Sequence, residues 1–132
     1  MAGRTNDNQA DPPTVLVVED EVLIRMATAD YLRGCGYHVV EAGSGDEAVV
    51  VFNTGISIDV VFTDVSMPGT LNGFGLAQWV HRERPGVRVI LTSGVTRTTQ
   101  EAKALCALGP LMEKPYQHGE VDRRIRALLA SR

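Results

Sequence analysis

The chain has 132 residues, a length typical of one globular domain around one hydrophobic core. Hydrophobic residues make up 44% of it and charged residues 22%, which favours a folded chain over a disordered one. The formal net charge of −3 gives no broad basic surface, and no apolar run reaches the length of a membrane span. We therefore expect neither a nucleic-acid partner nor a membrane partner.

Residues 1–13 are polar, end in two prolines and lack the apolar run of a signal peptide. We expect them to form a flexible leader in a cytoplasmic protein, followed by one domain over residues 14–132. Cys35 and Cys106 lie far apart and form no CxxC motif. This spacing indicates two ordinary thiols rather than a disulfide or metal framework.

The first expected elements are a strand and a helix. Thr14–Val18 is a β-branched run without alternation, as in a strand buried on both faces. The helix expected over residues 21–33 has an apolar stripe: Ile24, Ala27 and Tyr31. Gly34 and Gly36 are expected to end it by supplying left-handed backbone geometry.

A second strand is expected at residues 37–42, and Ser44 with Glu47 matches a capping box for a second helix. The inner face of that helix is expected to hold three residues: Ala48, Val49 and Phe52. Residues 58–63 form a third apolar run of strand length. A loop rich in proline and glycine, residues 67–73, follows it.

The third helix carries one apolar stripe: Leu76, Ala77 and Val80. Pro85 and Gly86 end it, a fourth strand is expected at 87–92, and a weakly amphipathic helix runs to about Leu108. A short fifth strand is expected at 109–113. The last helix has an apolar stripe: Val121, Ile125, Leu128 and Leu129. Five strand–helix units in alternation predict a parallel sheet with helices on both faces.

Polar residues follow these strands where each one ends. Glu19 and Asp20 follow the first strand, Asp64 the third, Ser93 the fourth and Lys114 the fifth. Because ligands bind at the carboxyl ends of parallel strands, we expect these side chains to share one edge of the sheet. Two carboxylates about 4 Å apart repel by ~4 kcal/mol at an effective dielectric constant near 20, so the cluster needs a cation or raised pKa values. Hard carboxylate oxygens suit Mg²⁺.

The order of these residues resembles the receiver domains of two-component response regulators over about residues 14–130. The matching segments are VLVVEDE at 15–21, VVFTDVSMPG at 60–69, NGFGLA at 72–77, VILTSG at 89–94 and MEKPY at 112–116. The resemblance implies a flavodoxin-like α/β fold, a doubly wound five-stranded parallel sheet in the order 2-1-3-4-5 with five helices. Within the family the chain resembles most the short stand-alone receivers of α-proteobacterial type.

The resemblance implies that Asp64 is the phosphoacceptor, a carboxylate nucleophile that takes a phosphoryl group from a phosphohistidine. It implies that Asp20, Asp64 and the backbone carbonyl of Ser66 ligate Mg²⁺. Glu19 is expected nearby or on a metal-bound water. The ion then offsets charge on the transferring group, and the remaining work is alignment.

Other roles follow from the same resemblance. Lys114 is expected to pair with a phosphate oxygen, and Ser93 to donate its hydroxyl to the phosphate and draw the following loop inward. We prefer Ser93 to its neighbour Thr92 because Gly94 fits the small residue that the family places next. The Lys114–Pro115 peptide bond is expected to be cis, which proline makes energetically accessible.

The chain departs from the family pattern at Leu111, where many receivers carry tyrosine or phenylalanine. We therefore expect the signal to travel through the loop after Ser93 and the fourth helix rather than through an aromatic side chain. Val95 offers no polar group to steer an attacking water, which predicts a durable acyl phosphate. With no output domain expected after the last helix, we expect the chain to act by binding a protein or by draining phosphoryl groups from a shared kinase.

The expected partners are a sensor histidine kinase or phosphotransfer protein, an unidentified downstream protein, and a second copy of the chain when phosphorylated. The chain is not expected to be an enzyme beyond catalysing its own phosphorylation and dephosphorylation. One alternative is a receiver-like scaffold that is never phosphorylated. A phosphatase with an aspartate nucleophile is disfavoured because Ser66 stands where a second aspartate is needed. A flavin-binding protein is disfavoured because acidic residues follow the first strand.

Overall fold

The computed structural model describes residues 11–94 and 99–131. The strands are β1 (Thr14–Val18), β2 (His38–Ala42), β3 (Val60–Asp64), β4 (Arg88–Ser93) and β5 (Leu111–Glu113). The helices are α2 (Val22–Gly34), α3 (Gly45–Asn53), α4 (Gly73–Glu83), α5 (Thr99–Cys106) and α6 (His118–Ala130). Their bounds differ from the expected ones by one or two residues at most ends. Among the described residues, no helix is both long and apolar enough to cross a bilayer.

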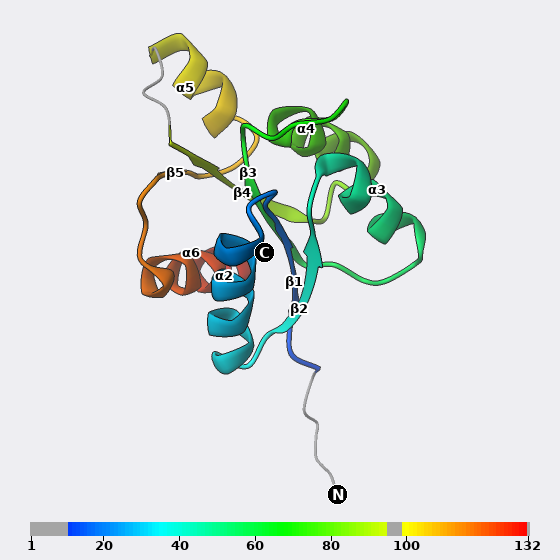
Figure 1. The fold of residues 1–132 in the computed structure, drawn as a ribbon, viewed down its shortest axis with the longest axis vertical. Coiled ribbons are helices and arrows are strands. Elements are labelled where there is room, and N and C mark those ends of the chain that lie inside the picture. The colour runs from blue at the N-terminus through cyan, green and yellow to red at the C-terminus, as the bar shows by residue number, and fades with distance from the viewer. Residues whose placement is uncertain (1–10, 95–98, 132) are drawn as a thin grey trace, which may run out of the picture.

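The five strands form one parallel sheet in the order β2-β1-β3-β4-β5, which confirms the predicted fold class and strand order. Helices α2 and α6 lie on one face of this sheet, and α3, α4 and α5 lie on the other (Figure 1). The chain reverses its direction of winding between β1 and β3, which are neighbours. Ligands of such sheets bind at the carboxyl ends of the strands beside this point.

The core is divided into two apolar clusters by the sheet. Leu16 and Val18 of β1 pack into the cluster under α3 and α4, whereas Val15 and Val17 pack into the cluster under α2 and α6. All four side chains are at most 1% exposed. The continuous apolar run of β1 therefore reflects burial on both faces, as the sequence predicts.

Helix α2 buries a different stripe from the one predicted. Ala27 and Tyr31 are exposed, and Tyr31 retains 41% of its accessible surface. The buried side chains are Thr28, Ala29 and Leu32. Thr28 can lie inside because its hydroxyl is 3.3 Å from the hydroxyl of Tyr116, so the polar group is hydrogen-bonded. The prediction that Ala27 and Tyr31 face the core was therefore wrong. The pattern within the helix does not reveal that Tyr116, 88 positions away, bonds the Thr28 hydroxyl.

The ends of two helices also refine the predictions. Helix α2 runs through Gly34. Of the two glycines predicted to end it, only Gly36 has a positive φ, 100°, so Gly34 supplies no left-handed geometry. At the start of α3 the Ser44 hydroxyl accepts from the Glu47 N–H at 3.1 Å, which confirms half of the capping box. The Glu47 carboxylate accepts from the N–H of Gly43, one residue earlier than the motif requires.

The loop between β3 and α4 is packed tightly against its neighbours. A Cβ at position 73 would collide with the backbone carbonyl of Asp64, and one at position 45 would collide with that of Leu71. The Thr70 hydroxyl also donates to the Asp46 carboxylate at 2.7 Å. Two glycines and one hydrogen bond thus fix the course of the chain that follows Asp64.

Candidate acidic site at the carboxyl edge of the sheet

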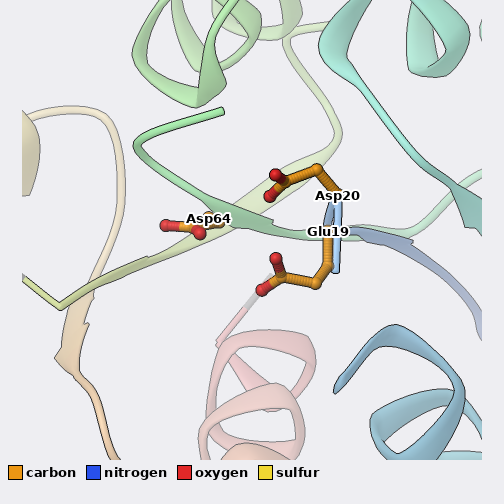
Figure 2. A group of neighbouring side chains, drawn as sticks. All are labelled: Glu19, Asp20 and Asp64. Carbon is orange, nitrogen blue, oxygen red and sulfur yellow. The ribbon is translucent and has the colours of Figure 1, made fainter. Parts of the chain in front are cut away.

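Three carboxylates from adjacent strands meet at the carboxyl edge of the sheet (Figure 2). Glu19 and Asp20 follow β1 and Asp64 ends β3, and one oxygen from each lies within 4.8 Å of the other two. Glu19 is 4% exposed and Asp64 8%, whereas Asp20 is more open to solvent. The sequence-based expectation that these residues share one edge is therefore met.

Backbone groups hold the two buried carboxylates in place. The Glu19 N–H donates to the carbonyl of Ala42 at 3.1 Å, so β1 stays registered with β2 up to the site. The Glu19 carboxylate accepts from the Glu21 N–H at 3.1 Å. The Asp64 carboxylate accepts from the Ser66 N–H at 3.3 Å. Each buried carboxylate thus has one oxygen oriented by the loop that follows it.

Lys114 supplies positive charge to the cluster. Its ammonium nitrogen lies 2.9 Å from Asp64 Oδ2 and 3.2 Å from Glu19 Oε1. Its backbone N–H donates to the Ser93 carbonyl at 2.9 Å, which ties the end of β5 to the end of β4. The Lys114–Pro115 peptide bond is cis, the geometry that the resemblance implies.

The electrostatics leave a surplus of negative charge. Burial raises the pKa of the Glu19 carboxyl above its usual value, against the opposing effects of the Glu21 N–H and Lys114. Burial lowers the pKa of the Lys114 ammonium, but its hydrogen bonds and ion pairs with Asp64 and Glu19 outweigh this and raise that pKa overall. Lys114 therefore stays charged, yet one cation faces three carboxylates.

The donor set fits a hard divalent cation. Oxygen atoms are the ligands that Mg²⁺ prefers, and proteins usually hold it with one or two carboxylates while it keeps several waters. Glu19, Asp20 and Asp64 are the residues that would hold such an ion. The exposure of Asp20 leaves one side of the cluster open to solvent, as a hydrated ion that recruits a phosphate requires.

The remaining predicted residues that the structure describes belong to β4 and β5 or follow β3 and β4. Ser93 ends β4 and is 3% exposed, and Ser66 is two residues beyond Asp64. A Cβ at Gly94 would lie 3.7 Å from Lys114 Cδ, so this position borders the lysine. Leu111 is partly buried against the apolar cluster on the α3–α5 face. Val95 lies outside the described residues.

One residue at the site was missed by the sequence analysis. The guanidinium of Arg25 in α2 donates to the backbone carbonyl of Glu19 at 2.9 Å. Its position six residues after Glu19, in the first turns of the helix that leaves the site, was the signal available. Its second partner, Glu41 in β2, is brought close only by the pairing of β1 with β2.

The fold and the edge site together define a flavodoxin-like, CheY-like α/β domain with an acidic centre. The family model described as response regulator receiver domain matches residues 15–126. The chain belongs to this family of two-component signalling domains. The segments that carried the resemblance in the sequence therefore led to the correct family.

Known relatives agree with this assignment. The chain is 37% identical over 118 residues to the transcriptional regulatory protein PdtaR of Mycobacterium tuberculosis, covering 88% of this chain and 57% of PdtaR. It is 33% identical over 116 residues to the probable transcriptional regulator ycf27 of Guillardia theta, covering 87% of this chain and 44% of that protein. The chain thus spans about half the length of these relatives. The relatives do not separate an α-proteobacterial type from the family, and that narrower assignment stays a prediction.

Solved structures show the same fold. The receiver domain of the Francisella response regulator 1452 superimposes with a TM-score of 0.80 at 26% identity, covering 90% of this chain and 98% of that one. A response regulator receiver protein from Pseudomonas putida gives a TM-score of 0.80 at 29% identity, covering 89% and 98%.

Proposed function

We propose that residues 14–132 form a cytoplasmic phosphoacceptor module in which Asp64 takes a phosphoryl group from a histidine kinase or a phosphotransfer protein in a Mg²⁺-dependent reaction. The observation that carries this proposal is the convergence of Glu19, Asp20 and Asp64 within 4.8 Å, with the Lys114 ammonium 2.9 Å from Asp64. A nucleophile, a cation site and a countercharge for phosphate oxygens are thus adjacent.

The transfer forms one bond and breaks one. An Asp64 carboxylate oxygen attacks phosphorus, the phosphorus–nitrogen bond of the phosphohistidine breaks, and its electron pair returns to the imidazole. The product is an acyl phosphate on Asp64. The bound ion would offset charge on the phosphoryl oxygens, and the protein's contribution is alignment. The chain acts on itself and turns over no other substrate.

Two side chains change partners in this proposal. Lys114 leaves Asp64 Oδ2 for a phosphoryl oxygen and remains paired with Glu19. Ser93 donates its hydroxyl to the phosphoryl group from the end of β4. Both lie at the carboxyl ends of strands next to α5, so the surface of α5, β5 and α6 is where we expect the change to be read. Its readers are a downstream protein or a second copy of the chain; without either, the chain acts as a phosphate sink.

The test is the intact mass of the protein after incubation with acetyl phosphate, with Mg²⁺ or with a chelator. We expect a single phosphoryl adduct on wild type that requires Mg²⁺ and is absent from Asp64→Asn. Asp59→Asn is the matched control, because Asp59 lies just before β3, at the other end of the strand, and should leave labelling unchanged.

Two results would contradict the proposal. An adduct on Asp64→Asn would place the phosphoryl group elsewhere. No adduct from either acetyl phosphate or a phosphorylated kinase, on protein that binds Mg²⁺, would favour the scaffold that binds a partner without phosphorylation.

A further inference from the structure

Arg25 connects three segments at the acidic site. Its Nη1 donates to the carbonyl oxygen of Glu19 at 2.9 Å, and its Nε donates to the Glu41 carboxylate at 3.3 Å. The side chain is 20% exposed, so it is largely enclosed. The space is available because residue 43 is glycine; a Cβ there would lie 3.2 Å from Arg25 Nη1. The end of β1, the start of α2 and the end of β2 thus meet at one guanidinium.

The carbonyl that Arg25 holds belongs to the peptide unit between Glu19 and Asp20. The Glu19 N–H on the preceding peptide is already bonded to Ala42. With both flanking peptide groups fixed, the backbone of Glu19 cannot rotate freely. Rotation of the second peptide would turn the Cα–Cβ bonds of Glu19 and Asp20 relative to each other. This hydrogen bond therefore adds to the Glu21 N–H and Lys114 contacts of Glu19 in setting how the two carboxylates face each other.

The charge of Arg25 works in the opposite direction. A guanidinium beside a cation site repels the cation, so its charge alone weakens metal binding. Glu41 offsets part of that charge at 3.3 Å, and also pairs with Arg33 at 3.1 Å. If Arg25 acts by orienting the carboxylates, its removal should weaken Mg²⁺ binding. If it acts only through its charge, its removal should strengthen Mg²⁺ binding, so a binding measurement distinguishes the two.

We propose that Arg25 is a positioning residue for the divalent-cation site, because its guanidinium fixes the Glu19–Asp20 peptide and so holds both carboxylates in the arrangement that binds Mg²⁺. This inference rests on the proposed Mg²⁺-dependent function. It assigns a role to a residue that contacts neither the phosphoryl group nor the ion.

The decisive variant is Arg25→Lys, measured by calorimetric titration of the unphosphorylated protein with Mg²⁺. Lysine keeps the positive charge, but its single nitrogen cannot serve Glu19 and Glu41 from two sites as Nη1 and Nε do. We expect the Mg²⁺ dissociation constant to rise roughly tenfold or more, the range seen when groups that orient metal ligands are removed. Arg25→Met should weaken binding similarly, although it removes a repelling charge.

The matched control is Arg33→Met, which removes the other arginine paired with Glu41 without touching Glu19. We expect its Mg²⁺ dissociation constant to equal that of wild type. A second readout is the rate of labelling by acetyl phosphate as Mg²⁺ is raised. For Arg25→Lys the Mg²⁺ concentration at half-maximal rate should rise, while the rate at saturating Mg²⁺ approaches that of wild type.

Three outcomes would overturn the inference. If Arg25→Lys lowers the free energy of unfolding but leaves the Mg²⁺ dissociation constant unchanged, Arg25 only stabilises the fold. If Arg25→Met binds Mg²⁺ more tightly and Arg25→Lys binds like wild type, charge decides and not position. If Arg33→Met weakens binding equally, the effect belongs to the whole ion-pair network. Failure of wild type to be phosphorylated would instead contradict the proposed function, since Mg²⁺ binding is measured separately.

Discussion

The two sides of the acidic site are built differently. The carboxylate side stands on β1 and β3, five-residue strands that each have a neighbour on both edges. The lysine side stands on β5, a three-residue strand at the edge of the sheet that pairs only with β4. Glu19 and Asp64 are therefore anchored within the sheet, whereas Lys114 follows a strand with few ladder bonds.

This difference separates a fixed part of the site from an adjustable one. Backbone hydrogen bonds and tight glycine contacts hold the carboxylates before any ligand arrives. Lys114 is held chiefly by the Ser93 carbonyl and by the carboxylates themselves. A new anion at the site would thus change the partners of Lys114 more readily than the positions of the carboxylates. Three pairs of substitutions test this comparison.

The largest expected difference is in how much stability the apolar side chains of β1 and of β5 contribute. Leu16 of β1 is 0% exposed, so Leu16→Ala should lower the free energy of unfolding by about 2–5 kcal/mol through lost burial and a cavity. Leu111 of β5 is only partly buried, and Leu111→Ala should cost less, about 1 kcal/mol. Urea denaturation of both variants measures this. Equal losses would show that β5 is as firmly packed as β1.

The next largest difference is expected in how closely the backbone is packed on the carboxylate side and on the lysine side. Gly73→Ala forces a Cβ into the backbone of Asp64 and should cost about 1–3 kcal/mol. Gly94→Ala is its matched counterpart, since the new Cβ meets the Lys114 side chain at an ordinary 3.7 Å. We expect Gly94→Ala to change stability by less than about 0.5 kcal/mol. A comparable loss for both would mean that the lysine side is as tight as the carboxylate side.

The smallest expected effect concerns the ion pair that joins the sides. Lys114→Met removes a group that lowers the pKa of Glu19, so that already raised pKa rises further. A raised folded-state pKa gives stability that is present below the ordinary value of 4.5 and lost as pH rises through the folded-state pKa. In metal-free buffer the deficit of the variant relative to wild type should thus grow as the pH rises from about 4 to neutral, by about 1–2 kcal/mol.

Lys103→Met is the control for that experiment, because Lys103 is exposed on α5. Its deficit should be small and the same at both pH values. A deficit in Lys114→Met that does not grow with pH would show that the lysine contributes packing rather than charge.

The fold was predictable because β1, β3 and β4 each contain a continuous apolar run and a helical pattern follows every strand. The buried stripe of α2 was not predictable, since three apolar side chains among its first five residues are exposed: Val22, Leu23 and Met26. Such a sequence offers several apolar stripes, and pattern alone does not choose among them. The helix buries Thr28 because Tyr116 meets its hydroxyl, a contact made across 88 positions.

The acidic cluster was predictable for a topological reason. The carboxyl ends of parallel strands share an edge, so residues that end strands meet whatever the details of packing. The contacts of Arg25 that support the cluster were not predictable, because Arg25 reaches Glu41 only once β1 and β2 are paired in register. Leu111 was recognised as a departure from the family pattern, and its partly buried position leaves its role in signalling a prediction.

The wide separation of Lys114 from its partners bears on how the chain is made. The carboxylates belong to the first half of the chain, while the lysine follows Asp64 by 50 positions and Glu19 by 95. A nascent chain that has exposed β1 to β3 would already bring three acidic groups together with no ammonium to face them. That repulsion disfavours early closure of the N-terminal half. The sheet is therefore expected to become stable only after β5 has left the ribosome, as one cooperative unit.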